Sequence, residues 1–261
     1  YRYSDGSYFE CQDMWRVSGI ERDVYLFATP KVHIKDFHAY TTLTDNYSKG
    51  ELQLSALIDN NQGHAVSGYR LKVQLFDHNQ KTLFEKNLDI KNLPKDESVT
   101  ITYTASIDKL RLWSAEEPNL YDLKLTLLDS QGYAIEHIGH NIGFRSTELK
   151  NGNILINGQA VLFKGVNRHE HDPVTAHVVT RELMLKDVQL MKQFNINAVR
   201  MAHYPNDPYM YYLADLYGLY VMDEANIESH GIGAANQGPY NPDTHLVNKP
   251  EWAAAYIDRV S

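Results

Sequence analysis

The chain has 261 residues, of which 43% are hydrophobic and 22% charged, a composition that is normal for a globular protein with room for two domains. Its formal net charge of −8 argues against nucleic-acid binding, which requires a basic surface. No apolar run has the length of a membrane span, so no membrane partner is expected. The single cysteine, Cys11, cannot form an internal disulfide, which fits a reducing, cytoplasmic compartment.

The first residues, 1–28, are too short to form a core of their own. They contain one turn signal, Asp5-Gly6-Ser7, followed by a stretch without clear periodicity. At the other end, Pro250 begins a predicted helix that is still running at Ser261. Both ends are therefore predicted to be cuts through a longer protein.

Residues 29–147 alternate between hydrophobic and polar side chains, the period of strands with one buried face. Turn clusters at 59–63, 77–80 and 129–132 separate the runs. Strands of this length over roughly 100–120 residues predict an antiparallel, immunoglobulin-like β-sandwich. The alternating positions are Leu52, Leu54, Ala56 and Ile58; Tyr69, Leu71, Val73 and Leu75; Val99, Ile101 and Tyr103; and Tyr121, Leu123, Leu125 and Leu127. His33, His38, His64 and His78 are predicted to be solvated.

From residue 148 onward the pattern changes to β-α-β-α-β. Strands are predicted over 160–166, 196–201 and 219–222, the last buried on both faces. One helix follows a Thr180 cap, and a second begins at Asp207-Pro208 and ends at Gly218. This order predicts parallel strands with right-handed crossovers, in either a (β/α)8 barrel or a doubly wound sheet.

Polar side chains cluster where the predicted strands end, as in the active sites of (β/α)8 barrels, which favours the barrel. They are Asn167, Arg168, His169, Glu170 and His171; Arg200 and His203; and Asp223, Glu224, Glu228 and His230. The carboxylates that follow the third strand repel one another when they are desolvated. They therefore require a cation, a hydrogen-bond network or shifted pKa values.

Three segments at these strand ends, 165–173, 197–205 and 217–231, closely resemble bacterial β-galactosidases of glycoside hydrolase family 2. Segments 5–7, 12–16 and 112–121 match the same family in the same order. Related β-glucuronidases share the His203-Tyr-Pro motif but, in this comparison, lack the Glu228-Ser-His that follows Ala225-Asn-Ile. The β-galactosidase branch is therefore favoured.

This resemblance implies a domain order. Residues 1–28 would be the tail of a jelly-roll sugar-binding domain, 29–147 an immunoglobulin-like β-sandwich, and 148–261 the N-terminal part of a TIM-barrel catalytic domain. It also implies a retaining hydrolase of terminal β-galactose residues, as in lactose, that is a homo-oligomer and uses Mg2+ and Na+.

The resemblance assigns site roles as well. Asp13 would contact galactosyl hydroxyls and Na+, and His169 and His203 would hydrogen-bond the sugar. Arg200 would organise the carboxylates, as an ion pair with Asp223 or Glu224, by touching the sugar, or both. Glu228 and His230 would hold Mg2+, although ligand type alone fits manganese or zinc as well. In the family both catalytic glutamates lie on later strands, so Glu170 and Glu224 are not assigned that role and this 261-residue chain alone is expected to be inactive.

Two alternatives remain open. One is another family 2 glycosidase, of the β-glucuronidase or β-mannosidase type, and the other is a non-catalytic carbohydrate-binding or assembly module. The complete set His169, His203, Glu228 and His230 favours an enzyme, because a scaffold does not need it. Four further residues receive a structural interpretation: Trp15 and Trp113 as packing residues, and His171 and His177 as loop residues.

Overall fold

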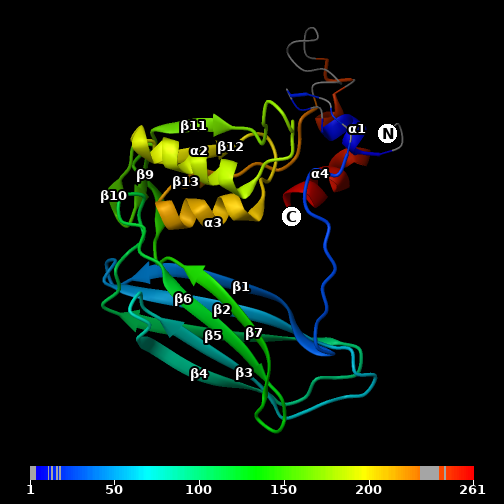
Figure 1. Ribbon diagram of the computed structural model, residues 1–261, viewed down its shortest axis with the longest axis vertical. Coiled ribbons are helices and arrows are strands. Elements are labelled where there is room, and N and C mark those ends of the chain that lie inside the picture. Colours follow the sequence, from blue (N-terminus) through cyan, green and yellow to red (C-terminus); the bar gives the residue numbers. More distant parts are fainter. Residues whose placement is uncertain are drawn as a thin grey trace. The chain divides into compact units, whose positions relative to one another are not determined.

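The computed structural model describes residues 4–10, 12, 14, 15, 17, 19–229, 241–243 and 245–261. Contacts divide the chain into two compact units (Figure 1). The sandwich unit is Tyr25–Leu162, and the barrel unit combines Tyr1–Val24 with Phe163–Ser261. Among the described residues, no helix has both the length and the apolar character that a membrane crossing requires.

Two antiparallel sheets form the sandwich unit, with strand orders β1-β2-β5 and β4-β3-β6-β7. Their bounds are β1 Val32–Thr44, β2 Lys49–Asn60, β3 Tyr69–Phe76, β4 Thr82–Ile90, β5 Ser98–Asp108, β6 Tyr121–Leu128 and β7 Ala134–Ile142. The predicted antiparallel sandwich is therefore confirmed. Because β4 pairs with β3, the fourth strand lies in the second sheet, unlike the constant-type immunoglobulin arrangement in which it joins the first, second and fifth strands.

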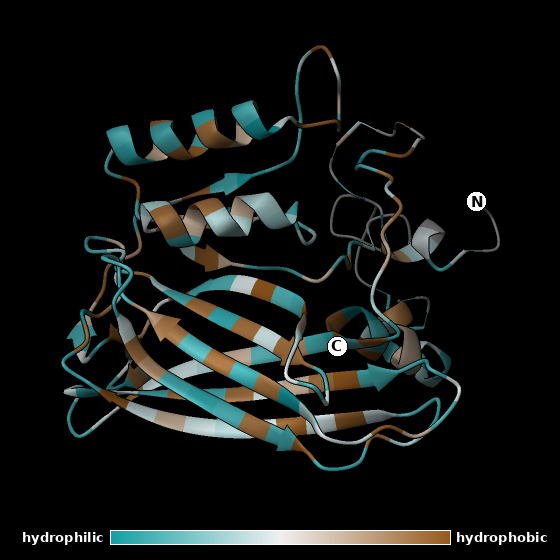
Figure 2. Cartoon of the chain, turned by 60° about the horizontal axis from the view of Figure 1, so that its bottom comes forward, coloured by the Kyte–Doolittle hydropathy of each residue, from teal (hydrophilic) through white to brown (hydrophobic). Residues whose placement is uncertain are grey.

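The core of the sandwich follows the predicted alternation, visible in Figure 2 as bands of opposite hydropathy along the strands. All predicted positions of β2, β3 and β6 are buried. In β5, however, Val99, Ile101 and Tyr103 pack only partly on the core, and its buried positions are Ala105 and Ile107. His38, His64 and His78 are exposed as predicted, whereas His33 is half-buried because its strand leads into the core at Val32 and Ile34.

A small meander of β8 Thr147–Lys150, β9 Asn153–Ile156 and β10 Gln159–Ala160 completes the sandwich unit. Its turns at Asn151-Gly152 and Asn157-Gly158 have positive φ at all four residues, as tight hairpins require. The predicted strand over 160–166 is therefore wrong at its start. Ala160 pairs backward with Leu155, and the first parallel strand begins only at Gly165.

Three parallel strands in the order β11-β12-β13 form the sheet of the barrel unit. They are β11 Gly165–Arg168, β12 Ala198–Met201 and β13 Tyr220–Met222, linked by helices α2 Arg181–Gln193 and α3 Pro208–Tyr217. The predicted helix boundaries are confirmed. Thr180 accepts from the Leu183 N–H, Asp207 accepts from the Tyr209 N–H, and Gly218 ends α3 with φ 75°.

One face of this sheet packs against the two helices. Val199 and Met201 of β12 are buried with Met184, Val188 and Met191 of α2 and Met210, Leu213 and Ala214 of α3. Arg200 alternates with these strand residues and points to the opposite face. The prediction that β13 is buried on both faces is wrong, since Val221 and Met222 are exposed. Within the described chain β13 has a strand neighbour on one side only.

The first described residues pack against the last helix of the same unit. The predicted turn at 5–7 instead opens a short helix, α1 Gly6–Phe9, which lies beside α4 Ala253–Val260 (Figure 1). Phe9 is fully buried there, with its ring 5.3 Å from that of Trp252 and 4.7 Å from that of Tyr256. Two short 3-10 turns, η3 Leu246–Asn248 and η4 Pro250–Trp252, precede α4.

Candidate functional site

Polar side chains gather at the edge of the barrel unit where the three parallel strands end. His169 and Glu170 follow β11, His203 follows β12, and the carboxylates at 223, 224 and 228 follow β13. The carboxyl ends of parallel strands share one edge, so these loops meet. Arg168 and Arg200 belong to the strands themselves, which corrects the prediction that Arg168 lies past the end of its strand.

Arg200, His203 and Glu224 form one connected network. Arg200 Nε donates to Glu224 Oε1 at 2.5 Å, and His203 Nδ1 lies 2.6 Å from Glu224 Oε2 and 3.1 Å from Arg200 Nη2. Of the two carboxylates predicted as ion-pair partners of Arg200, the structure shows Glu224, and contact of Arg200 with the sugar stays a prediction. Because a carboxylate can only accept, the 2.6 Å contact places a proton on His203 Nδ1, which therefore donates to Glu224 and does not accept from Arg200 Nη2.

The environment of Glu224 keeps it ionised. Burial raises the pKa of Glu224, but the hydrogen bonds from Arg200 and His203 outweigh burial and hold that pKa below its usual range. A carboxyl group held in this state cannot act as a proton donor near neutral pH. Glu224 is thus suited to fixing His203 and Arg200 rather than to general acid chemistry.

Glu228 lies next to this network. Its Oε1 is 3.8 Å from His203 Nδ1, and its backbone N–H donates to the Phe9 carbonyl at 2.5 Å. A half-buried carboxylate beside a second one suits a hard cation, which prefers oxygen ligands. The described residues bring together no group of three or more His, Cys, Asp or Glu side chains that could hold a metal ion, and the role of Glu228 as a metal ligand stays a prediction. The predicted ligands His230 and Asp13 lie outside the described residues.

His169 stands beside His203, with ring centroids 5.3 Å apart and an interplanar angle of 74°. It lines a small pocket together with Met14, Trp15 and His171. Trp15 is 53% exposed, so it is not the packing residue that was expected, whereas Trp113 is buried as predicted. An exposed indole beside two imidazoles gives this edge an aromatic surface.

His177 is a loop residue, as predicted. Its Nε2 lies 2.7 Å from the Trp15 carbonyl and its Nδ1 lies 3.3 Å from the Glu170 carbonyl. Two carbonyl acceptors require a proton on both ring nitrogens, and the bond to Trp15 is the main reason that the pKa of His177 is raised. His171 is exposed and contacts Trp15 edge-on.

Comparison with known proteins identifies the family. A model described as "Glycosyl hydrolases family 2" matches residues 32–145, and one described as "Glycosyl hydrolases family 2, TIM barrel domain" matches residues 147–261. The chain belongs to glycosyl hydrolase family 2. The three-stranded sheet is therefore the start of a TIM-barrel domain, and the sandwich is the family 2 domain that precedes it.

The chain is homologous to bacterial β-galactosidases of family 2. It is 45% identical over 262 residues to a β-galactosidase of Priestia megaterium, covering 99% of this chain and 25% of that protein. It is 42% identical over 269 residues to one of Yersinia enterocolitica, covering 100% and 25% respectively. The chain thus spans about a quarter of the length of these relatives.

Solved structures of β-glucuronidases share the fold. A β-glucuronidase of Bacteroides uniformis superimposes with a TM-score of 0.78 at 23% identity, covering 88% of this chain and 28% of that one. A β-glucuronidase of Parabacteroides merdae gives a TM-score of 0.66 at 26% identity, covering 74% and 24%. The architecture is therefore shared with proteins named for a different activity.

The sequence did not reveal how several residues of this family 2 site are held. Buried Glu170 accepts from Arg22 Nη2 at 3.1 Å and from the Asp207 N–H at 2.7 Å. Buried Arg168 donates to Asp187 at 2.9 Å and to Asn206 at 2.7 Å, away from the network. Pairs so far apart in sequence leave no local pattern. Among the N-terminal residues, Gln12 lies within the matched segment 12–16, whereas Arg22 lies in no matched segment.

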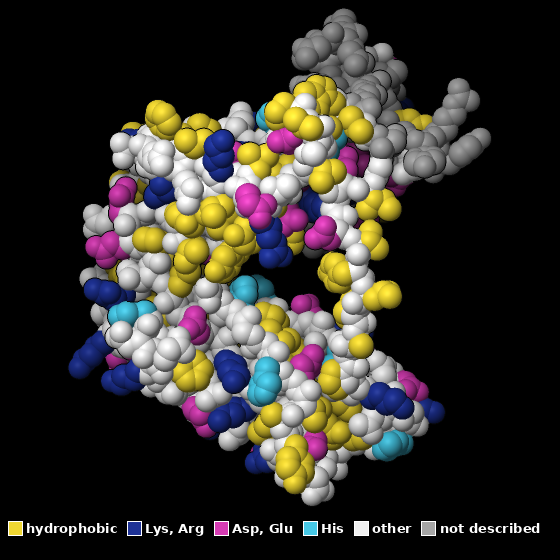
Figure 3. Space-filling view, in the orientation of Figure 1, with side chains coloured by type: hydrophobic (Ala, Val, Ile, Leu, Met, Phe, Trp, Pro, Cys, Tyr) yellow, Lys and Arg dark blue, Asp and Glu magenta, His cyan; other side chains and the backbone are white. Residues whose placement is uncertain are grey.

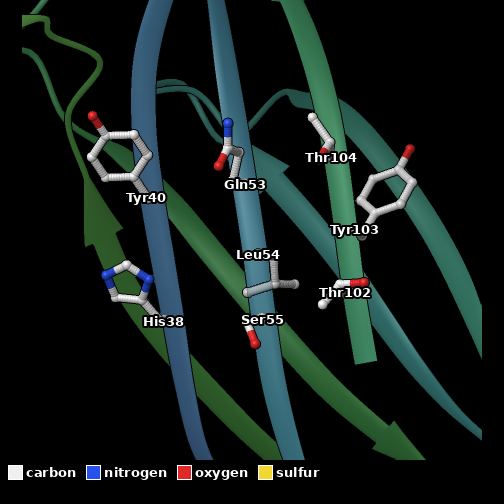
Figure 4. A pocket seen from close by; sticks show the side chains of 8 residues that line it. All are labelled: His38, Tyr40, Gln53, Leu54, Ser55, Thr102, Tyr103 and Thr104. Atoms are coloured by element: carbon white, nitrogen blue, oxygen red, sulfur yellow. The ribbon is translucent and has the colours of Figure 1, made fainter. Parts of the chain in front are cut away.

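The sandwich unit has a shallow pocket of about 480 Å³ on the outer face of the β1-β2-β5 sheet (Figure 4). It is lined by His38, Tyr40, Gln53, Leu54, Ser55, Thr102, Tyr103 and Thr104. No carboxylate lines it, so it lacks the paired acids that glycoside hydrolysis requires. The candidate site is therefore the edge of the barrel unit.

Proposed function

We propose that this chain is part of a retaining β-galactosidase that releases terminal non-reducing β-D-galactose residues from galactosides such as lactose. The observation that carries the proposal is identity of 41–45% over the whole chain to proteins named β-galactosidase. The Arg200–His203–Glu224 network at the strand ends supports it, because it fixes an imidazole at the edge where a barrel enzyme binds substrate.

In this proposal the chain supplies sugar binding. His169 and His203 hydrogen-bond the galactosyl hydroxyls, and ionised Glu224 fixes His203 while pairing with Arg200. These bonds strengthen as the ring distorts towards an oxocarbenium-like transition state. The nucleophile and the acid/base are glutamates on later barrel strands of the longer protein, about 5–5.5 Å apart as in retaining enzymes. The 261 residues alone therefore do not turn over galactosides.

The proposed metals belong to the same site. Glu228 and His230 would hold Mg2+, and Asp13 would hold Na+ and touch the sugar. A divalent cation supplies charge neutralisation among carboxylates, which lowers the cost of holding them together. Glu228 fits this role because its oxygens lie beside the network and it is only partly exposed.

Three further features are proposed from the family resemblance. Residues 1–28 form the tail of a jelly-roll sugar-binding domain, although within this chain Tyr1–Val24 group with the barrel unit. The full-length enzyme is a homo-oligomer and is cytoplasmic. Size-exclusion chromatography with light scattering tests the oligomeric state, and cell fractionation tests the cytoplasmic location.

A substrate panel tests the proposed activity. The full-length protein is assayed with nitrophenyl β-galactoside, β-glucuronide and β-mannoside at equal concentration. We expect turnover of the galactoside only, with galactose released in the β configuration. Preference for the glucuronide or mannoside would indicate one of the other family 2 activities. Binding of galactose without turnover of any of the three would indicate a non-catalytic module.

The Glu228→Gln substitution tests the metal assignment in the full-length enzyme. Gln keeps the shape of the side chain but removes one negative ligand, so the Mg2+ concentration for half-maximal activity should rise about 10- to 100-fold. Excess Mg2+ should restore much of kcat, and the thermal midpoint in chelator should stay unchanged. Identical Mg2+ midpoints for the two proteins would remove Glu228 from the metal site.

A further inference from the structure

One short segment contacts the loops after all three parallel strands. We call the described residues within 4–24 the N-terminal strap. The strap bonds to the loop after β11 through Arg22 and Trp15, to the loop after β12 through Gln12 and Arg22, and to the loop after β13 through Phe9 and Gln12. Its partners are 148 or more residues away in sequence for each side-chain bond made by Gln12 and Arg22.

Gln12 joins the two loops that carry the central network. Its Nε2 donates to the His203 carbonyl at 3.3 Å and to Asn226 Oδ1 at 2.9 Å. His203 belongs to the loop after β12, and Asn226 lies between Glu224 and Glu228 in the loop after β13. One amide therefore links the His203 backbone to the Asn226 side chain, in the two loops whose side chains meet in the His203–Glu224 contact.

Arg22 makes the corresponding connection on the other side. Its Nη2 donates to Glu170 Oε2 at 3.1 Å and to the Pro205 carbonyl at 2.6 Å. Glu170 also accepts from the Asp207 N–H, so this buried carboxylate ties the loop after β11 to the start of α3. Arg22 and Gln12 thus brace the His203 loop from two directions.

The strap has a separate anchor that accounts for its attachment. Phe9 is fully buried between Trp252 and Tyr256, with the Arg259 guanidinium 5.1 Å from the centre of its ring. Burial of an aromatic side chain contributes several times more to stability than a single amide hydrogen bond does. Removing the Gln12 bonds should therefore leave the strap in place and alter mainly the loops.

We propose that Gln12 is a positioning residue for His203 in galactoside hydrolysis, with Arg22 as its counterpart on the neighbouring loop. This inference depends on the proposed β-galactosidase function. Gln12 acts by fixing the His203 backbone relative to the loop of Glu224 and Glu228. His203 then meets the sugar hydroxyl in the geometry of the transition state.

The test uses the full-length enzyme with Gln12→Glu and Gln12→Met. The glutamate turns both donors into acceptors that face the His203 carbonyl and the Asn226 oxygen, and methionine keeps the length without any donor. We expect kcat and kcat/KM to fall together by about 10- to 100-fold, because small misplacements of a positioned group cost that much. KM and the thermal midpoint should change little. Arg22→Lys should lower kcat about tenfold, because lysine lacks the fork that reaches two acceptors.

A matched control makes the same chemical change elsewhere. Gln131→Glu lies in the exposed β6–β7 turn of the sandwich and should retain wild-type kinetics. A planar lactone that mimics the transition state should bind Gln12→Met more weakly in proportion to its loss of kcat/KM. Wild-type kinetics in both Gln12 variants would overturn the proposal. A loss of activity explained entirely by a lowered thermal midpoint would also overturn the proposal. A wild-type enzyme without activity on galactosides would instead contradict the proposed function itself.

Discussion

Two titratable side chains of the barrel unit show how hydrogen-bond partners set the charge of a group. Glu224 receives donors from Arg200 and His203, which favour its ionised form. His177 faces the carbonyls of Trp15 and Glu170, which favour its protonated form. The first arrangement holds the His203 imidazole in place, and the second ties the strap to the loop after β11.

The raised pKa of His177 makes the barrel unit sensitive to pH. Its stabilising contribution is complete below the unfolded pKa of about 6.5 and is lost as the pH rises through the higher folded pKa. We expect the free energy of unfolding of the barrel unit to fall over this range. In His177→Gln the dependence should be absent. Denaturant midpoints measured at a series of pH values test this.

His64→Gln is the control for this pH dependence. His64 is exposed in a turn of the sandwich, so its substitution should leave the pH profile of the barrel unit unchanged. A profile for His177→Gln that parallels the wild type would show that the contact with the Trp15 carbonyl does not depend on protonation of His177.

At this scale the sequence predicted which residues meet but not what holds them. The position of His169, His203 and the carboxylates at strand ends followed from the β-α-β order, because parallel strands present their ends at one edge. The roles of Gln12 and Arg22 depend on partners 148 to 214 residues away, and no periodicity encodes such pairs. The sequence left open whether Arg200 pairs with Asp223 or with Glu224, and the structure shows the pair with Glu224.

At the scale of elements, caps and turns were the most predictable features. Helix α2 begins after its N-cap Thr180. Helix α3 begins after its N-cap Asp207 and ends at Gly218, as the capping chemistry of these residues predicts. The errors fell where pairing overrides local pattern. Ala160 pairs with Leu155 in the meander, because the Asn157-Gly158 turn reverses the chain just before it. Strand β13 is exposed, because its burial depends on neighbouring elements that the strand's own sequence does not specify.

Strand β2 contains a glycine that the packing of the sandwich requires. A Cβ at Gly50 would overlap the Leu110 side chain and lie 2.6 Å from Phe144 Cδ1. Both neighbours are packed in the core, so Gly50→Ala should destabilise the sandwich by about 1–3 kcal/mol. A lower urea midpoint with an unchanged slope would report this loss.

Gly139 of β7 is the matched control, since a Cβ there would meet nothing within 4 Å. Gly139→Ala removes the conformational freedom of glycine from the unfolded chain and should be neutral or slightly stabilising. If both substitutions cost the same, the loss would reflect a general intolerance of strands to alanine rather than overlap at Gly50.

At the scale of the whole molecule, the two units differ in how completely they bury their apolar surface. The sandwich has a continuous core drawn from both of its sheets. The barrel unit buries one face of its sheet against α2 and α3, while Phe163, Val166, Val221 and Met222 are exposed. Figure 3 shows further hydrophobic side chains over α3, where Tyr212 and Leu216 are exposed.

This difference predicts that the sandwich unit is the more stable part of the 261-residue chain. Three strands cannot close a barrel of eight, so β13 presents an unpaired edge within the described chain, and fewer contacts oppose its opening. Native-state hydrogen exchange should show slow exchange for the amides of β2, β3 and β6 and faster exchange for those of β11–β13.

In the full-length protein this contrast in exchange rates should shrink, because the remaining strands and helices of the barrel would cover this surface. Equal protection of both units in the 261-residue chain would mean that the contacts of α2, α3 and the strap already stabilise the partial barrel fully. Unchanged fast exchange in the full-length protein would mean that its further residues do not complete this sheet.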